Sequence, residues 1–274
     1  MKEYLVNSVN EFIDQIKVLD IKGKTSGDRF WFRAENEKHA DTFLRPNLFR
    51  NYFENSIFPN RHFTIIEETY RTLFLSEAYP IINKNYGRLN KLAEQFLMQH
   101  YGMHTRLLDW SDNALISLFF ASEDIYANHD AVVWVLNPFT LNYYTRVHQE
   151  DITQSPRFIL PTIDENESIE RYFDLKILYE KNRHVELPIA IKPFYLDDRM
   201  KNQSSNFTFF GWNSNGLLSH PFNEEFLVKV TIPKSKLREI KRDLYELGIS
   251  YDTIYPGLEG ISKKLVYASE EYYI

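Results

Sequence analysis

Polar side chains that could do chemistry are concentrated in one stretch of twelve residues, Gln99–Trp110, with the sequence QHYGMHTRLLDW. Amide, imidazole, hydroxyl, guanidinium and carboxylate groups all occur there, on Gln99, His100, Tyr101, His104, Thr105, Arg106 and Asp109. A purely structural connection does not need so many groups that form hydrogen bonds or carry charge. The apolar run Ala114–Ala121 follows and predicts a buried helix. We therefore expect the stretch to lie between two packed elements, where a scaffold holds functional groups in fixed positions.

A second candidate group is the guanidinium of Arg33, in the aromatic segment RFWFRA. The aromatic side chains predict a strand, and a charge among them is costly unless it has a dedicated partner. One such partner is a phosphate group of a ligand, because the planar guanidinium fork matches phosphate oxygens. The other is a structural ion pair with a carboxylate such as Asp109. We favour the ligand.

Structural roles compete with functional ones inside the twelve-residue stretch. Arg106 and Asp109 are three positions apart and could form an ion pair with each other. His100 and His104 have the four-residue spacing of a zinc site on a helix, but Gly102 interrupts the helix and no third ligand stands at a fitting distance. We therefore expect no metal ion, and a hydrogen-bonding role for His100.

Composition limits the class of protein. The 274 residues are 43% hydrophobic and 16% aromatic, which suffices for one large domain or two small ones. The sequence has no apolar run of about 18 residues, so no membrane span is expected, and its first residues lack the pattern of a signal peptide. The absence of cysteine excludes disulfides and thiolate metal sites and favours a cytoplasmic location.

Net charge argues against a general electrostatic grip on nucleic acid, because the chain carries −6 at neutral pH. A local basic run is nevertheless the best candidate for contact with RNA or DNA. Such a run is usually a solvated helix face, and as a contact it would make binding depend on salt. Its members are Lys229, Lys234, Lys236, Arg238, Lys241 and Arg242.

Hydrophobic periodicity and turn residues predict the elements that must position these groups. Helices are expected over Asn7–Leu19, Phe63–Ala78, Arg88–Gln99, Asp112–Ile125, Asn166–Tyr179 and Lys234–Leu247. Strands are expected over Arg29–Ala34, Asp130–Leu136, Ile189–Pro193, Asn206–Phe210 and Phe226–Ile232. The polar segment 140–186 is expected to be an insertion or lid. Because strands and helices do not alternate simply, the pattern favours the α+β class in a single domain.

Several segments together resemble the FRG domain of bacteria and phages. The resemblance rests on WFRA at Trp31–Ala34, LRPNLFR at Leu44–Arg50 and QHYGMHTRLLDWSDNALISLFFA at Gln99–Ala121. The family shows Gly where this chain has Ala34, and Pro where it has His104. Later segments, Asp198–Phe210 and Gly248–Ile261, also look similar to the family. The resemblance covers nearly the whole chain and implies a single FRG-type domain over residues 1–274.

The organisation of that family looks similar to the ADP-ribosyltransferase superfamily. The resemblance implies a mixed or split central sheet flanked by helices, and an effector that uses NAD as a substrate to modify a macromolecule. It implies a role as a toxin or in phage defence. The acceptor would be a protein or a nucleic acid, and an antitoxin or other partner protein could accompany the chain.

The same resemblance implies roles for residues of the site. Arg33 would hold the pyrophosphate of NAD, and Gln203 would orient the nicotinamide ribose. Tyr101 would stack on the nicotinamide unless it belongs to the core. In the cofactor-binding set, His100 and Thr105 would bond the ribose while Arg106 and Asp109 brace the loop. We expect Arg33, His100, Arg106, Asp109 and Gln203 to line one cleft.

Two residues, Gln203 and Glu259, have alternative roles. Gln203 could instead bond to backbone at a helix end, and Glu259 is an alternative carboxylate with a plainer role in a turn. A glutamine cannot place negative charge against an oxocarbenium-like transition state, and no strong general base is evident, so catalysis would depend on positioning and fixed dipoles.

The rival function is a non-catalytic nucleotide- or peptide-binding module in a defence or toxin–antitoxin system.

Overall fold

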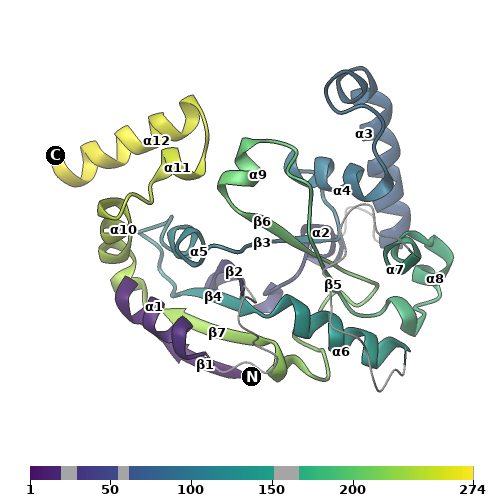
Figure 1. Cartoon of the computed structure of the whole chain (residues 1–274), viewed down its shortest axis with the longest axis horizontal. Helices are drawn as coiled ribbons and strands as arrows, with labels where there is room; N and C mark the ends of the chain where they lie inside the picture. The colour runs from purple at the N-terminus through teal and green to yellow at the C-terminus, as the bar shows by residue number, and fades with distance from the viewer. Residues whose placement is uncertain (20–29, 55–61, 151–166, 274) are drawn as a thin grey trace.

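One seven-stranded sheet runs through the part of the chain that the computed structural model describes, residues 1–19, 30–54, 62–150 and 167–273 (Figure 1). The strand order is β1-β7-β4-β2-β3-β6-β5. The pair β1–β7 is parallel and the other neighbours are antiparallel, so the sheet is mixed. The strands are β1 (Lys2–Leu5), β2 (Trp31–Asn36), β3 (Leu107–Ser111), β4 (Ala131–Leu136), β5 (Ile189–Ile191), β6 (Ser205–Phe209) and β7 (Leu227–Ile232).

The sequence of β4, AVVWVL, explains why helices cover both faces of the sheet. All of its residues are buried, because β-branched and aromatic side chains pack on both sides of a pleated strand. Val132 and Trp134 belong to one hydrophobic cluster, and Val133 and Val135 belong to another. The core therefore has two halves that the sheet separates.

Each half of the core has its own set of helices. On one face the sheet packs against α1 (Val9–Val18), α5 (Ala114–Ala121) and α10 (Leu237–Glu246), which lie together at the left of Figure 1. The other face packs against α2 (Asn47–Glu54), α3 (Phe63–Asn85), α4 (Lys91–His100) and α6 (Pro138–Glu150). The shorter helices are α7 (Glu167–Glu170), α8 (Leu175–Tyr179), α9 (Asp198–Asn202), α11 (Tyr251–Ile254) and α12 (Leu258–Ala268).

The sheet is split between β2 and β3. These neighbours share a single register pair, Phe32 with Ser111, whereas β2 pairs with β4 and β3 pairs with β6 along their whole lengths. One part of the sheet is β1-β7-β4-β2 and the other is β3-β6-β5. The split leaves backbone edges and side chains of β2 and β3 facing a common space.

The structure confirms the α+β class and the mixed sheet flanked by helices. The five predicted strands correspond to β2, β4, β5, β6 and β7 with small shifts at their ends, and Gly248 follows α10 with a positive φ of 83°, as its predicted capping position requires. The prediction omits β1, β3 and α6. The single helix expected over Asn166–Tyr179 is wrong for the described residues, which form α7, a 3₁₀ turn and α8.

The segment 140–186, expected to be an insertion or lid, includes most of helix α6, which packs into the core. In α6, Leu141 and Thr145 are fully buried. The side chain of Asn142 donates to the carbonyl of Ala190 at 2.9 Å and accepts from its N–H at 2.7 Å. The polar composition of α6 serves buried hydrogen bonds to β5, so the helix belongs to the core; residues 151–166 lie outside the described part of the chain.

None of the helices in the described ranges combines the length and apolar composition that crossing a lipid bilayer requires.

Candidate functional site

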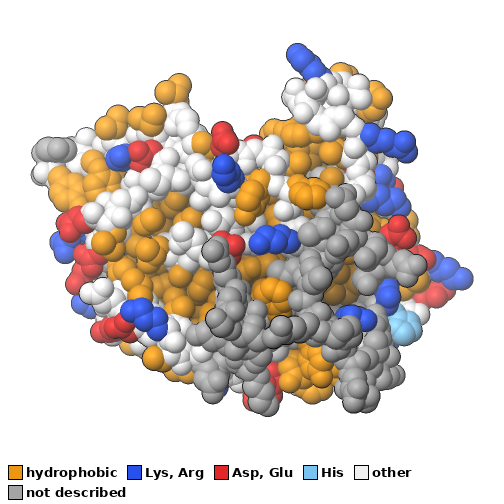
Figure 2. Space-filling view, viewed as in Figure 1, with side chains coloured by type: hydrophobic (Ala, Val, Ile, Leu, Met, Phe, Trp, Pro, Cys, Tyr) orange, Lys and Arg blue, Asp and Glu red, His pale blue; other side chains and the backbone are white. Residues whose placement is uncertain are grey.

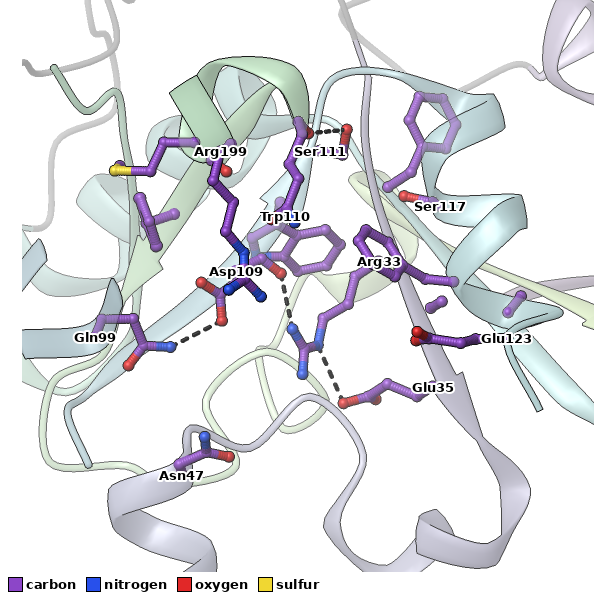
Figure 3. Close-up of a pocket in the computed structure, with 18 of the residues that line it drawn as sticks. Arg33, Glu35, Asn47, Gln99, Asp109, Trp110, Ser111, Ser117, Glu123 and Arg199 are labelled. Atoms are coloured by element: carbon purple, nitrogen blue, oxygen red, sulfur yellow. Dashed lines mark hydrogen bonds and ion pairs between the residues drawn. The ribbon is translucent and has the colours of Figure 1, made fainter. Parts of the chain in front are cut away.

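A pocket of about 730 Å³ occupies the split between β2 and β3 (Figure 3). Segments that are far apart in the sequence form its walls: β2, the end of α4, β3, α5 with the turn after it, and α9 with the start of β6. Its polar lining includes Arg33, Glu35, Asn36, Asn47, Gln99, His100, Asp109, Ser111, Ser117, Glu123, Asp124, Arg199, Gln203 and Ser205.

Arg33 bridges the split in the sheet. Its Nη1 donates to the backbone carbonyl of Asp109 on β3 at 2.9 Å, and its Nε donates to the carboxylate of Glu35 at 3.1 Å. The expected ion pair with the Asp109 carboxylate is therefore not the one found, because the structural partner is Glu35. A guanidinium has five N–H donors, so the two bonds leave donors available to a ligand in the pocket.

Glu35 holds Arg33 in place. Its side chain is only 4% exposed and accepts from Arg50 at 2.6 Å and from the backbone N–H of Leu44 at 2.9 Å, in addition to Arg33. Leu44 has a left-handed backbone with φ of 55°, a strained conformation that points its N–H to the carboxylate. Because its oxygens are occupied by three donors, Glu35 is a positioning residue.

Asp109 is oriented by a chain of hydrogen bonds behind the pocket wall. The hydroxyl of Thr105 accepts from the N–H of Leu107 at 3.1 Å and donates to Gln99 Oε1 at 2.6 Å. The amide nitrogen of Gln99 then donates to Asp109 Oδ2 at 2.8 Å (Figure 3). Thr105 is fully buried, so it does not line the pocket, and its contribution reaches the pocket through Gln99.

His100 lies at the end of α4 and lines the pocket. Its Nε2 contacts Asp197 Oδ2 at 2.5 Å, and Asp197 Oδ1 caps the N-terminus of α9 by accepting from the N–H of Met200 at 2.9 Å. His100 therefore ties α4 to α9. Gln203 ends α9, and its backbone carbonyl accepts from the Ser111 hydroxyl at 2.7 Å, while its side chain lines the pocket.

Arg199 brings a second guanidinium into the pocket from α9 (Figure 3). It lies over the ring of Tyr255 at 5.2 Å, and within the described residues it makes no hydrogen bond to the protein. The hydroxyl of Tyr255 donates to Glu123 at 3.2 Å. Burial and the nearby charge of Glu123 raise the pKa of Tyr255, so this tyrosine remains a neutral donor beneath Arg199.

Arg106 is not in the pocket, contrary to expectation. It is fully buried, with Nε donating to Glu67 at 2.7 Å and the two terminal nitrogens donating to the carbonyls of Phe210 and Tyr172, each at 2.7 Å. The expected alternative, an ion pair with Asp109, is not found either. Arg106 stands directly before strand β3 and Asp109 stands within it. Because successive side chains of a strand point to opposite faces, two residues three positions apart point away from each other.

Three other candidates lie away from the pocket lining. Tyr101 is 62% exposed and its hydroxyl is 3.5 Å from that of Tyr86, so it is neither a core residue nor part of the pocket wall. His104 lies against Tyr70, apart from His100. Glu259 is on the first turn of α12, paired with Lys263 at 2.8 Å. Within the described residues, no three His, Cys, Asp or Glu side chains are grouped to hold a metal ion.

The six basic residues do not form one surface. Lys229 belongs to β7 and pairs with Glu37, whereas the others lie on or before α10, where Lys236 pairs with Glu239 and Arg238 with Glu271. Figure 2 shows acidic and basic side chains interspersed around α1 and α10. Lys241 is buried and donates to the Glu123 carbonyl at 2.9 Å and to the Tyr251 hydroxyl at 2.7 Å, so its ammonium group faces the protein interior.

Three residues of the site were not predicted from the sequence: Glu35 and Arg199, which line the pocket, and Gln99, which orients Asp109. Glu35 carried a detectable signal, since a carboxylate two positions after Arg33 lies on the same face of a strand. Gln99 stands inside the selected stretch. Arg199 carried no local signal, because only the fold brings α9 to the split between β2 and β3.

A family model described as the FRG domain matches residues 28–130. This match agrees with the resemblance seen in the sequence, and the matched range includes β2, α4, β3 and α5 and thus most of the pocket wall. Arg199 and Gln203 come from outside the matched range. Neither the curated proteins nor the solved structures include a match to this chain.

Proposed function

We propose that this chain, whose residues 28–130 match the FRG domain, is an ADP-ribosyltransferase-like effector that uses NAD as its substrate. One observation supports this most: Arg33 and Arg199, more than 150 positions apart, both line the pocket that also contains Asp109. Two guanidinium groups suit the two phosphates of a dinucleotide, since each can bind phosphate oxygens in a bidentate manner. The pocket volume of about 730 Å³ lies within the range of small-molecule sites.

The proposed roles belong to side chains that line the pocket. Arg33, fixed by Glu35, binds one phosphate with its remaining donors, and Arg199 binds the other. The side chain of Gln203 orients the nicotinamide ribose, and His100 bonds a ribose hydroxyl. Catalysis then consists of separating nicotinamide from the ribose carbon and transferring ADP-ribose to a macromolecule, in the cytoplasm and in a toxin or phage-defence role.

The acceptor is a protein or a nucleic acid in this proposal. A protein suits the acidic net charge of −6. Nucleic acid contact would depend on the exposed members of the basic run, Lys234, Lys236, Arg238 and Arg242. A partner protein or antitoxin would act on the open side of the pocket.

Labelled NAD tests the proposal. Purified protein is incubated with cell extract and NAD carrying label in its adenylate half, and the products are digested separately with nuclease and with protease. We expect transfer of label by the wild type, at least tenfold less transfer by Arg33→Ala, and unchanged transfer by Lys17→Ala, whose exposed side chain on α1 is outside both the pocket and the basic run. The digestion that releases the label identifies the acceptor class.

Calorimetry with NAD separates the two candidate functions. Binding of NAD without transfer or hydrolysis would favour the non-catalytic nucleotide-binding module. Absence of both transfer and binding would overturn the assignment of NAD to this pocket.

A further inference from the structure

Among the residues that the structure describes, four carboxylates line the pocket, and their surroundings differ. Glu35 is buried and occupied by Arg33, Arg50 and the backbone of Leu44. Glu123 accepts from Tyr255. Asp124 accepts from the N–H of Tyr126 and so caps a turn.

Asp109 is the carboxylate that combines an exposed side chain with a fixed orientation. It stands between the buried residues Leu108 and Trp110 on β3, so its backbone is held by the sheet. Gln99 occupies Oδ2 from one side. In the described structure, no protein donor occupies Oδ1, which is left to a molecule in the pocket.

A chain of hydrogen bonds runs from Thr105 to Asp109. The Thr105 hydroxyl accepts from the Leu107 N–H and donates its own hydrogen to Gln99 Oε1. This bond fixes which end of the Gln99 amide faces Asp109, and the amide N–H₂ is the end that remains. This donated hydrogen bond holds Oδ2 and so fixes the orientation in which Asp109 presents Oδ1 to the pocket.

We infer that Asp109 is the general base that accepts the proton of the incoming nucleophile. This inference rests on the proposed function, and it supplies the base that sequence reasoning did not find. Thr105 and Gln99 are positioning residues that act through Asp109. The flanking Asp109 carbonyl is bound to Arg33, so the same residue links the base to the proposed phosphate-binding group.

The step balances as a displacement at the ribose C1′ of NAD. The bond between C1′ and the pyridinium nitrogen breaks, and its electron pair neutralises the nitrogen, so that neutral nicotinamide leaves. An O–H or N–H nucleophile of the acceptor, or water, forms the new bond to C1′ and transfers its proton to Asp109 Oδ1. Solvent then takes this proton, which restores the carboxylate.

Steady-state kinetics of nicotinamide release by the purified full chain tests the inference. Asp109→Asn keeps the shape and can still accept from Gln99 through its Oδ1, but it places an amide group where the proton acceptor was. We expect kcat to fall about 100-fold or more, in the range for removal of a general base, with KM and the calorimetric Kd for NAD changed less than threefold.

A matched pair of variants tests the positioning chain. Thr105→Val removes the hydroxyl that fixes Gln99, and should lower kcat about tenfold without weakening NAD binding, whereas Thr105→Ser keeps the hydroxyl and should restore the wild-type rate. Denaturation midpoints of all variants report whether each is folded.

The outcomes distinguish the inference from the function it rests on. If the wild type releases nicotinamide and folded Asp109→Asn does so at a kcat within threefold, the base is elsewhere while the NAD proposal stands. If the wild type neither binds nor cleaves NAD, both are overturned.

Discussion

The guanidinium of Arg106 joins three segments that are distant in the sequence. It donates to Glu67 on α3, to Phe210 after β6 and to Tyr172 after α7, with each distance 2.7 Å. Its carbon Cζ also lies 4.6 Å from the ring centre of Phe209. A buried charge with this many bonds is costly to disturb, because its partners cannot turn to water.

Arg106→Met should therefore lower the free energy of unfolding by about 3–5 kcal/mol, because it leaves the Glu67 carboxylate buried without a cation. Urea denaturation measures the loss. The double variant Arg106→Met with Glu67→Leu should recover much of it, since the stranded charge is removed as well. A loss below about 1 kcal/mol, typical of exposed ion pairs, would contradict the buried role.

The position of Arg106 also predicts its effect on the ligand. Folded Arg106→Met protein should bind NAD as tightly as the wild type, because this side chain does not line the pocket. A tenfold weaker Kd by calorimetry, in a variant whose denaturation curve shows a folded state, would return Arg106 to the ligand-binding role.

Helix α10 is joined to α5 and to the C-terminal helices through Lys241. The ammonium group is enclosed by the rings of Phe119, Tyr251 and Tyr267, 4.7 to 5.5 Å from their centres. Burial lowers the pKa of Lys241 to about 8, although the nearby charges of Glu123 and Asp124 oppose the shift. Packing thus lowers the pKa of a lysine that the sequence shows only as part of a basic run.

This lowered pKa predicts how stability depends on pH. An unfolded lysine titrates near 10.4, so between about pH 8 and 10 the unfolded state binds more protons than the folded state, and stability rises with pH. The gain is on the order of 3 kcal/mol over this window. Above pH 10 the raised pKa values of Tyr251 and Tyr267 act in the opposite direction, because these phenols ionise more readily in the unfolded chain.

Urea denaturation at pH 7, 8, 9 and 10 measures this rise. Lys241→Met replaces the ammonium by an apolar group of similar length, and its stability should not rise over the same interval. Equal pH profiles for the two proteins would contradict the assignment of the effect to Lys241.

Elements with strong local patterns were predictable, and those defined by tertiary pairing were not. The segment AVVWVL of β4 carries six consecutive apolar residues and was identified within one residue. β3 was missed because LLDWS is short and contains an exposed aspartate; it is a strand because it pairs with β6. The polar residues of α6 look like a surface segment in the sequence, but they form hydrogen bonds in the core to β5 and to Pro188 just before it.

The candidate site was predictable only in part for the same reason. Arg33 stands out as a charge in an aromatic strand, and Asp109 as part of a dense polar stretch. The role of Glu35 depends on its ion pairs with Arg50 and Arg33, and the role of Arg199 depends on the position of α9 beside the split in the sheet. No residue spacing encodes these approaches, because they depend on how the two parts of the sheet are arranged.

At the scale of the whole molecule, the pocket lies where the two parts of the sheet meet. Between β2 and β3 there is one register pair, Phe32 with Ser111, and the Arg33 guanidinium bonds the Asp109 carbonyl close to it. Strand β4 has paired neighbours on both sides, whereas β2 and β3 each have one edge along the split. A ligand that fills the pocket should therefore stabilise the junction more than the rest of the sheet.

Hydrogen exchange followed by mass spectrometry tests this. Peptides that cover β2 and β3 should exchange faster than the peptide that covers β4, because amides along the split lack a neighbouring strand. Saturating NAD should slow exchange in β2, β3 and α9, and at about 100 times its Kd it should raise the free energy of unfolding by about 2.7 kcal/mol. Arg33→Ala should speed exchange in β3 even without NAD, since the side chain no longer bonds the Asp109 carbonyl, while the β4 peptide stays unchanged. Protection by NAD that appears in α3 and not at the split would place the ligand elsewhere and contradict this account of the junction.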